Sequence, residues 1–224
     1  MVGKRKYDDG CAVAHGLDLV GERWMLLVVR DLLLGPKRFT DLRIGMPGIS
    51  PDVLTQRLRE LTQTGIVQRR KLPAPAGSWV YELTEWGMQL ETIVIQVGRW
   101  ASRSPTLRHD AEISTDSLAL SLKALFAPHV ATGLQAIIAL KLGEDQLRIE
   151  IADSQFHITR KEPSNPDVII HTDPNTLAAL LHIDLSISQA LKANTLTIEG
   201  PLHLFEQFLT LFPLPQPAPL TEPN

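Results

Sequence analysis

The chain has 224 residues, of which 44% are hydrophobic, so it is long enough for two domains with a core in each. Its single cysteine excludes an internal disulfide framework and is typical of a reducing compartment. The N-terminal stretch lacks the apolar core of a signal peptide, and no apolar run is long enough to cross a bilayer. We therefore expect a cytoplasmic protein without a membrane partner.

Charge divides the chain near Ser104. Residues 1–104 hold 15 Lys and Arg against 11 Asp and Glu, a net charge of +4, whereas residues 105–224 hold 7 against 14, a net charge of −7. This asymmetry predicts two domains, 1–104 and 105–224, that meet different partners.

The first half begins with helical apolar spacing at residues 11–20, 23–34 and 40–45. After the turn MPGI at residues 46–49, Ser50 is expected to cap a helix over residues 51–64, with Pro51 at its first position. A short helix, a tight turn and a capped amphipathic helix together predict a helix-turn-helix motif.

The predicted helix over residues 51–64 has two unlike faces. One face is apolar and is formed by Val53, Leu54, Leu58 and Leu61. The other face carries Asp52, Thr55, Gln56 and Arg59, which are side chains that read base edges and phosphates but also occur on any solvated helix.

A hairpin is predicted directly after this helix. Gly65 ends the helix, residues 66–72 form a strand with the basic run Arg69, Arg70 and Lys71, and residues 79–83 return as its partner. Basic side chains on such a wing could meet the phosphate backbone, although an edge strand also uses charge to prevent aggregation. Their place beside a helix-turn-helix favours double-stranded DNA as the partner.

Several motifs over residues ~11–100 resemble the HxlR family of bacterial winged-helix transcription regulators. They are the Cys at the start of the first helix, a G-x-x-W entry to the second, GPKRFTDL, the PGIS turn, LTQRLREL and Y-x-LT-x-x-G. The resemblance implies a homodimer on a pseudo-palindromic operator, with residues 51–64 in the major groove and the wing at the flanking backbone. It also implies DNA contacts by Ser50, Thr55, Gln56, Arg57 and Arg59.

Two further features belong to this half. Thr84 is expected to cap a long helix over residues 85–102, whose apolar face favours pairing with a second subunit over packing on its own core.

Cys11 is predicted at a helix N-terminus near Lys4, Arg5 and Lys6, which would favour the thiolate. Some members of the family are thiol-based sensors, so the resemblance makes Cys11 a candidate redox sensor; the alternative is a small buried side chain.

In the second half, residues 116–126 are predicted to form a helix. After this helix, apolar and polar residues alternate with a period of two. Strands are predicted at residues 136–142, 146–152, 155–160, 168–171 and 196–200, and helices at 174–182, 186–193 and 201–212, before a Pro-rich tail. We interpret this as an α+β domain in which helices cover an antiparallel five-stranded sheet.

The pattern PDVIIHTDPNTLAALLH…LTIEGPLHLFEQFLTLF resembles the sterol carrier protein domain, over residues ~115–212. That resemblance implies a site for lipids or other apolar ligands between helices and sheet, against the alternative of a filled core. The candidate lining residues are Leu180, Leu181, Ile183, Leu185, Leu191, Phe205, Phe208, Leu209 and Phe212.

Catalysis finds little support in the sequence. The seven histidines are scattered, and neither a metal-ligand spacing nor a nucleotide-binding or nucleophile-elbow motif is present, so we expect no enzyme, cofactor or metal. The leading hypothesis is a homodimeric DNA-binding regulator that senses an apolar small molecule or lipid. Two alternatives are an apolar-ligand carrier whose helix-turn-helix serves assembly, and a regulator whose C-terminal domain only supports dimerisation.

Overall fold

A computed structural model describes residues 6–108, 111–182 and 185–219. The chain forms two compact units, Met1–Val94 and Ile95–Asn224, each described below by itself. The boundary between them falls inside helix α6 (Leu90–Ala101), about ten residues before the change in charge at Ser104.

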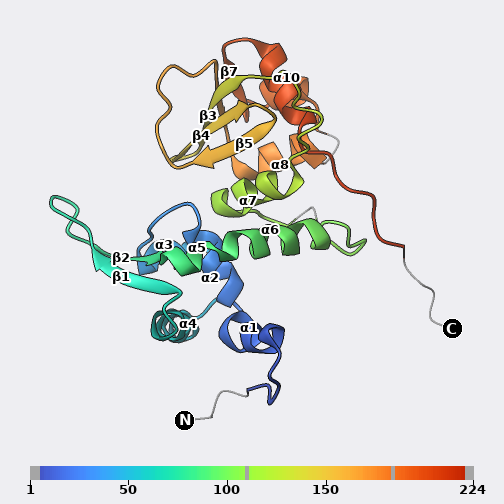
Figure 1. Cartoon of the computed structure of the whole chain (residues 1–224). Coiled ribbons are helices and arrows are strands. Elements are labelled where there is room, and N and C mark those ends of the chain that lie inside the picture. Colours follow the sequence, from blue (N-terminus) through green and yellow to red (C-terminus); the bar gives the residue numbers. More distant parts are fainter. Residues whose placement is uncertain (1–5, 109–110, 183–184, 220–224) are drawn as a thin grey trace. The chain divides into compact units, whose positions relative to one another are not determined.

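The first unit has the predicted winged helix-turn-helix fold (Figure 1). Before α6 its elements are α1 (Ala12–Val20), α2 (Met25–Leu32), α3 (Phe39–Gly45), α4 (Pro51–Gln63), β1 (Val67–Lys71), β2 (Trp79–Leu83) and α5 (Glu85–Met88). Leu54, Leu58 and Leu61 of α4 are fully or almost fully buried, and α4 packs on α2 and β1. The apolar stripe read from the sequence is therefore the core face of this helix.

Helix α4 begins at the predicted residue and ends one residue before the predicted end, and both ends have local causes. The hydroxyl of Ser50 accepts a hydrogen bond from the Val53 amide at 3.3 Å, and Pro51 occupies the first turn. At the other end Gly65 has φ +75°, a left-handed conformation that favours glycine, and the Ile66 amide donates to the Leu61 carbonyl. Strand β1 then follows at once.

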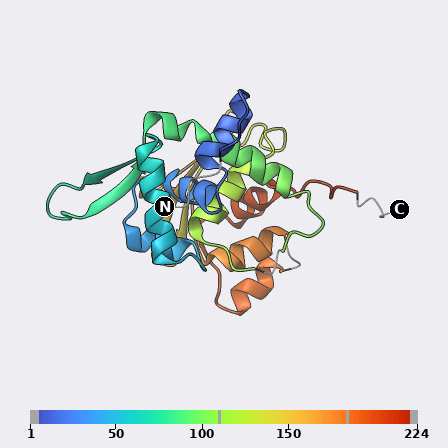
Figure 2. The ribbon, with the colours of Figure 1, turned by 90° about the horizontal axis from the view of Figure 1, so that it is seen from below.

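Strands β1 and β2 pair antiparallel, with Val67 opposite Leu83 and Lys71 opposite Trp79. In two perpendicular views this hairpin projects beyond the helices of its own unit (Figure 1 and Figure 2). It therefore has the form of a wing next to α4.

The prediction of one long helix over residues 85–102 is wrong, because the structure has two helices there, α5 and α6. Thr84 caps α5 as predicted by accepting a hydrogen bond from the Gly87 amide at 3.0 Å, but α5 ends at Met88, and Gln89, whose backbone is right-handed helical, separates it from α6. The Gly87 backbone lies so close to Ile66, the residue before β1, that an added Cβ would be 2.1 Å from the Ile66 carbonyl oxygen. Helix α5 therefore packs closely against the backbone that leads into β1.

The second unit is an α+β domain. After α6 it contains α7 (Thr115–Leu125), β3 (Ala136–Leu142), β4 (Asp145–Ala152), β5 (Gln155–Thr159), β6 (Val168–Thr172), α8 (Pro174–His182), α9 (Ile187–Lys192), β7 (Thr197–Glu199) and α10 (Leu202–Thr210). The five strands lie in the order β5-β4-β3-β6-β7. The fold class is as predicted, but the all-antiparallel sheet is wrong, because β6 pairs with β3 in parallel, with Ile138 opposite Val168.

One face of this sheet forms the core of the second unit. Alternate residues of β3 and β4, including Ile138, Leu140, Leu147 and Ile149, are buried. Helix α7 contacts β5, α10 contacts β6, and α8 contacts both helices. The alternation follows from the two-residue period of a strand with one covered face.

None of the helices within the described residues has the length and hydropathy that a bilayer crossing requires. Within residues 6–108, 111–182 and 185–219, His, Cys, Asp and Glu side chains do not gather in a group that could hold a metal ion.

Candidate nucleic-acid interface and ligand-binding unit

The exposed face of α4 carries the polar side chains expected from the sequence. Asp52, Thr55, Gln56 and Arg59 are all exposed. The Thr55 hydroxyl donates to the Pro51 carbonyl at 2.8 Å, and the Gln56 amide donates to the Glu60 carboxylate at 3.0 Å. The Arg59 guanidinium has no ion pair with another described residue, so it can form one with a ligand.

Arg57 lies in a different environment. Its side chain is 15% exposed and forms ion pairs with Glu60 at 2.8 Å and Glu22 at 3.2 Å. Its Nε also donates to the Arg23 carbonyl at 3.1 Å. These bonds join α4 to the segment between α1 and α2, so Arg57 positions the helix.

The three basic residues of the wing are also unequal. Arg69 stacks on the Trp79 ring at 4.5 Å, Arg70 forms an ion pair with Glu82 at 2.6 Å, and Lys71 is exposed near the hairpin tip. The sequence presents them as one basic run, but their cross-strand neighbours distinguish them.

Two basic residues were missed by the sequence reasoning. Arg38 and Arg43 are exposed at the two ends of α3, the helix before α4 in the helix-turn-helix. In such motifs the first helix commonly crosses the phosphate backbone. The density of basic residues in KRFTDLR was the signal that could have identified them.

Cys11 is exposed and immediately precedes α1. Interactions with the backbone amides of Ala14 and Val13 in the first helical turn lower the pKa of its thiol. Lys4 and Arg5, which the sequence places near Cys11 as cations that would favour the thiolate, lie outside the described residues.

Family models match both units. Residues 19–109 match the HxlR-like helix-turn-helix model, and residues 117–213 match the SCP-2 sterol transfer family. The HTH-type transcriptional regulator YodB of Bacillus subtilis (strain 168) is 39% identical over 85 residues, which cover 38% of this chain and 76% of YodB. The chain belongs to the HxlR-like helix-turn-helix family.

Two solved structures are similar in sequence to part of this chain. The reduced form of YodB from B. subtilis is 34% identical, with a TM-score of 0.39, over 44% of this chain and 97% of that chain. The redox regulator HypR in its oxidized form is 35% identical, with a TM-score of 0.41, over 43% of this chain and 100% of that chain. YodB is a transcriptional regulator and HypR is a redox regulator, and this chain carries an SCP-2 domain after its HxlR-like part.

The apolar residues predicted to bind a ligand in this SCP-2 domain differ in burial. Phe205, Phe208 and Phe212 are at most 1% exposed, and the rings of Phe208 and Phe212 meet edge to face with centroids 5.0 Å apart. Leu191 is 40% exposed, whereas Leu180, Leu181, Leu185 and Leu209 are half-buried. Ile183 lies outside the described residues. The three phenylalanines are thus core residues, and the leucines are the more accessible members.

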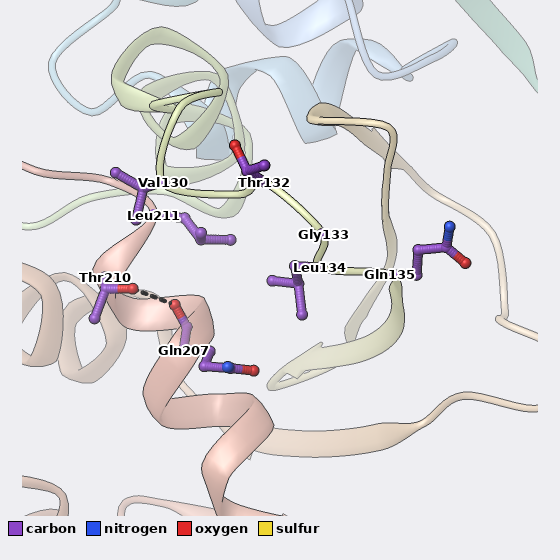
Figure 3. A pocket seen from close by; sticks show the side chains of 8 residues that line it. All are labelled: Val130, Thr132, Gly133, Leu134, Gln135, Gln207, Thr210 and Leu211. Atoms are coloured by element: carbon purple, nitrogen blue, oxygen red, sulfur yellow. Dashed lines mark hydrogen bonds between the residues drawn. The ribbon is translucent and has the colours of Figure 1, made fainter.

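A pocket of about 580 Å³ opens elsewhere in the second unit. Figure 3 shows Gln207, Thr210 and Leu211 of the α10 region on one side and the loop before β3 on the other. The lining residues are Val130, Thr132, Gly133, Leu134, Gln135, Gln207, Thr210 and Leu211. They carry apolar and neutral polar groups but no formal charge, and none of them was predicted from the sequence.

An ion-pair cluster fixes the sheet edge of this unit. Arg160 bonds to the almost buried Asp116 of α7 at 2.9 Å and to Asp145 of β4. Burial disfavours the charged guanidinium, but both carboxylates outweigh it and raise the pKa of Arg160 above its ordinary value. The cluster holds the start of α7 against the sheet.

Proposed function

We propose that the chain is a homodimeric transcription regulator that binds double-stranded DNA through α4 and the wing. The observation that carries this proposal is the exposed polar face of α4 beside a projecting basic hairpin in the same unit. Asp52, Thr55, Gln56 and Arg59 would meet base edges, and Ser50 the adjacent backbone. Arg57, Arg69, Arg70 and Lys71 would position α4 or meet phosphates.

Binding to mixed genomic fragments at rising salt tests this proposal. The wild-type chain should select fragments, and Arg59→Ala should reduce that selection by about 1–3 kcal/mol if Arg59 reads a base. The Arg69, Arg70, Lys71 triple alanine variant should bind all fragments more weakly with a shallower salt dependence. Lys192→Ala removes one exposed charge from α9 and is the matched control. A wild-type chain that fails to bind fragments even at low salt would contradict the proposal.

The homodimer would form through α6 and neighbouring apolar side chains. Helix α6 has no buried residue, and Ile93, Val97 and Trp100 recur on one helical stripe while 50%, 47% and 78% exposed. A stripe of this kind is stabilised when a second copy covers it. A two-fold dimer would also place two α4 helices on one operator.

The second unit would bind an apolar or amphipathic effector. The match to the SCP-2 sterol transfer family supports this part of the proposal. Two locations are available, namely the half-buried leucines of α8–α10 and the uncharged pocket at Leu134 and Thr210. To change DNA binding, the effector must have different affinities for two states of the chain.

Titration of the full chain with a fluorescent fatty acid tests effector binding and separates the two locations. Thr210→Trp should weaken binding if the probe occupies the pocket, whereas Leu191→Glu should weaken it if the probe lies among the helices. Repeating the fragment-binding experiment with saturating probe then measures coupling. An unchanged DNA affinity would contradict effector sensing by this class of molecule.

Cys11 is a second candidate site at which the proposed regulator could sense a signal. Its thiol is exposed and its pKa is lowered, and the relative YodB has been solved in a quinone-bound form. Thiolate is the reactive form of cysteine, so we include electrophile or oxidant sensing at Cys11 in the proposal.

A further inference from the structure

The wing contains an aromatic platform for one of its cations. The Arg69 guanidinium carbon lies 4.5 Å from the centre of the Trp79 ring and 6.0 Å from the centre of the Tyr81 ring. Tyr81 is the direct cross-strand partner of Arg69, and Trp79 is the partner of Lys71, two residues further along β1. The strand period therefore places Arg69, Trp79 and Tyr81 on one face of the hairpin.

Arg70 has a different partner on the other face. Glu82 accepts hydrogen bonds from Arg70 at 2.6 Å and from Gln68 at 2.9 Å. A carboxylate at this distance neutralises much of the positive potential that Arg70 would offer to a phosphate. Arg69 stacks on aromatic rings, which carry no formal charge, so the positive potential that it offers to a phosphate is not reduced in this way.

Stacking and phosphate binding use different parts of a guanidinium. The face of the group rests on the aromatic ring, while the N–H donors point outward in the guanidinium plane. A phosphate can therefore bind at the edge without displacing the ring. Trp79 is 51% exposed, so the platform itself stands at the surface of the wing.

We propose that Trp79 is a positioning residue that orders the Arg69 guanidinium for a DNA phosphate. Arg69 is then the principal phosphate contact of the wing, and Arg70 chiefly supports the hairpin through Glu82. This inference rests on the proposed DNA-binding function and deepens it. It assigns different roles to neighbouring arginines of the same strand.

A double-mutant cycle on the full chain tests the inference, with binding to a fluorescent mixed-sequence duplex measured over a range of salt. Arg69→Ala should weaken binding about three- to tenfold and lower the salt slope by about one for each wing that contacts the duplex. Trp79→Ala should weaken binding about two- to fivefold, although it removes no charge. Trp79→Phe keeps an aromatic face and should recover most of the lost affinity.

The double variant Arg69→Ala/Trp79→Ala gives the decisive comparison. If Trp79 acts through Arg69, the double variant binds as weakly as Arg69→Ala alone, with no further loss. Losses that multiply would overturn the inference, because Trp79 would then act independently of Arg69. Thermal melting of each variant measures any damage to the fold.

The matched control is Arg148→Ala/Glu150→Ala, which removes an ion pair of β4 in the second unit without changing the net charge and should bind as the wild type does. The pair Arg70→Ala/Glu82→Ala removes the ion pair of the wing in the same way and should weaken binding less than Arg69→Ala does. A loss as large as that of Arg69→Ala would overturn the inference. A wild-type chain that does not bind the duplex would overturn the proposed function and this inference together, whereas binding with multiplying losses overturns the inference alone.

Discussion

At the scale of single residues, the surroundings of each basic side chain decide what it can do. Arg57 is held by two carboxylates and a carbonyl, whereas the nearby Arg59 extends from the exposed face of α4 without an ion-pair partner among the described residues. The HxlR resemblance implies DNA contacts for both arginines, but on the helical wheel only Arg59 lies on the polar face, while Arg57 lies nearer the apolar edge. The structure supports a positioning role for Arg57 and leaves Arg59 available to a ligand.

Replacing Arg57 by alanine should destabilise the first unit. The change removes bonds to Glu22, Glu60 and the Arg23 carbonyl and leaves these acceptors without their cation. We expect a loss of about 1–2 kcal/mol in the free energy of unfolding, measured by denaturant titration. Arg59→Ala is the control and should stay within about 0.5 kcal/mol of the wild type. Equal stabilities for the two variants would contradict the positioning role.

Cys11 should react faster in the folded chain than in the unfolded chain near neutral pH. Its pKa is lowered by the Ala14 and Val13 amides, so the folded state holds more thiolate below the ordinary thiol pKa. As the chain has one cysteine, iodoacetamide labelling followed by mass spectrometry reports on Cys11 alone. The pH profile of the folded chain should have its midpoint below that of the chain in denaturant. Coincident midpoints would refute the effect.

The polar face of α4 could be predicted because a helical period and a cap are local signals. The unequal roles of the wing cations could not, since they depend on Glu82 and Trp79, which reach β1 only across the hairpin. The DNA contact predicted for Arg57 came from the family resemblance, whereas its ion-pair partner Glu22 is 35 residues away in sequence. Contacts of this range have no signature in a local pattern.

At the scale of elements, most helices and strands lie within two residues of their predicted bounds, and α4 and β2 illustrate why. Caps, Pro and Gly mark their ends, and burial gives α4 a clear helical period. The interruption at Gln89 was missed because the apolar spacing continues through this residue into α6. The parallel pairing of β3 and β6 was missed because period alone does not choose a partner strand.

Substitution of Gly87 by alanine should disrupt the junction of α5 and β1. The new Cβ would lie 2.1 Å from the Ile66 carbonyl oxygen and 3.2 Å from the Leu83 side chain, so backbone must move. A loss of about 1–3 kcal/mol in the free energy of unfolding is expected from such overpacking.

Gly16→Ala is the matched control for this substitution. Gly16 lies within α1, and an added Cβ would have no atom within 4 Å. Because alanine is the better helix former, this variant should be as stable as the wild type or more stable by up to about 1 kcal/mol. A Gly87→Ala chain as stable as this control would show that the close approach is not restrictive.

At the scale of the whole molecule, a basic DNA-binding unit is joined to an acidic SCP-2 unit through α6. This helix carries the exposed stripe that we assign to dimerisation, and the boundary between the units falls within it. A partner helix that covers α6 would therefore contact residues of both units in one continuous element.

A charge on the α6 stripe should separate the dimer. Val97→Glu places a carboxylate on the stripe, where pairing with a second copy would bury it without a cation. Light scattering over a concentration series should show a monomer at concentrations where the wild type is a dimer. Gln96→Glu puts the same charge on a neighbouring exposed position and should remain dimeric. A Val97→Glu chain with unchanged mass would exclude this stripe as the interface.

The parallel pairing of β6 with β3 also governs what happens when the chain is shortened or is still being made. Strand β3 is central in the sheet, and its sequence AIIALKL has a single charge. Before β6 pairs with β3, the amides and carbonyls along one edge of this apolar strand have no partner. Such an edge is a template for cross-β association. Chains that end before residue 168 should accumulate as insoluble material, so β6 protects the molecule from aggregation as well as completing its sheet.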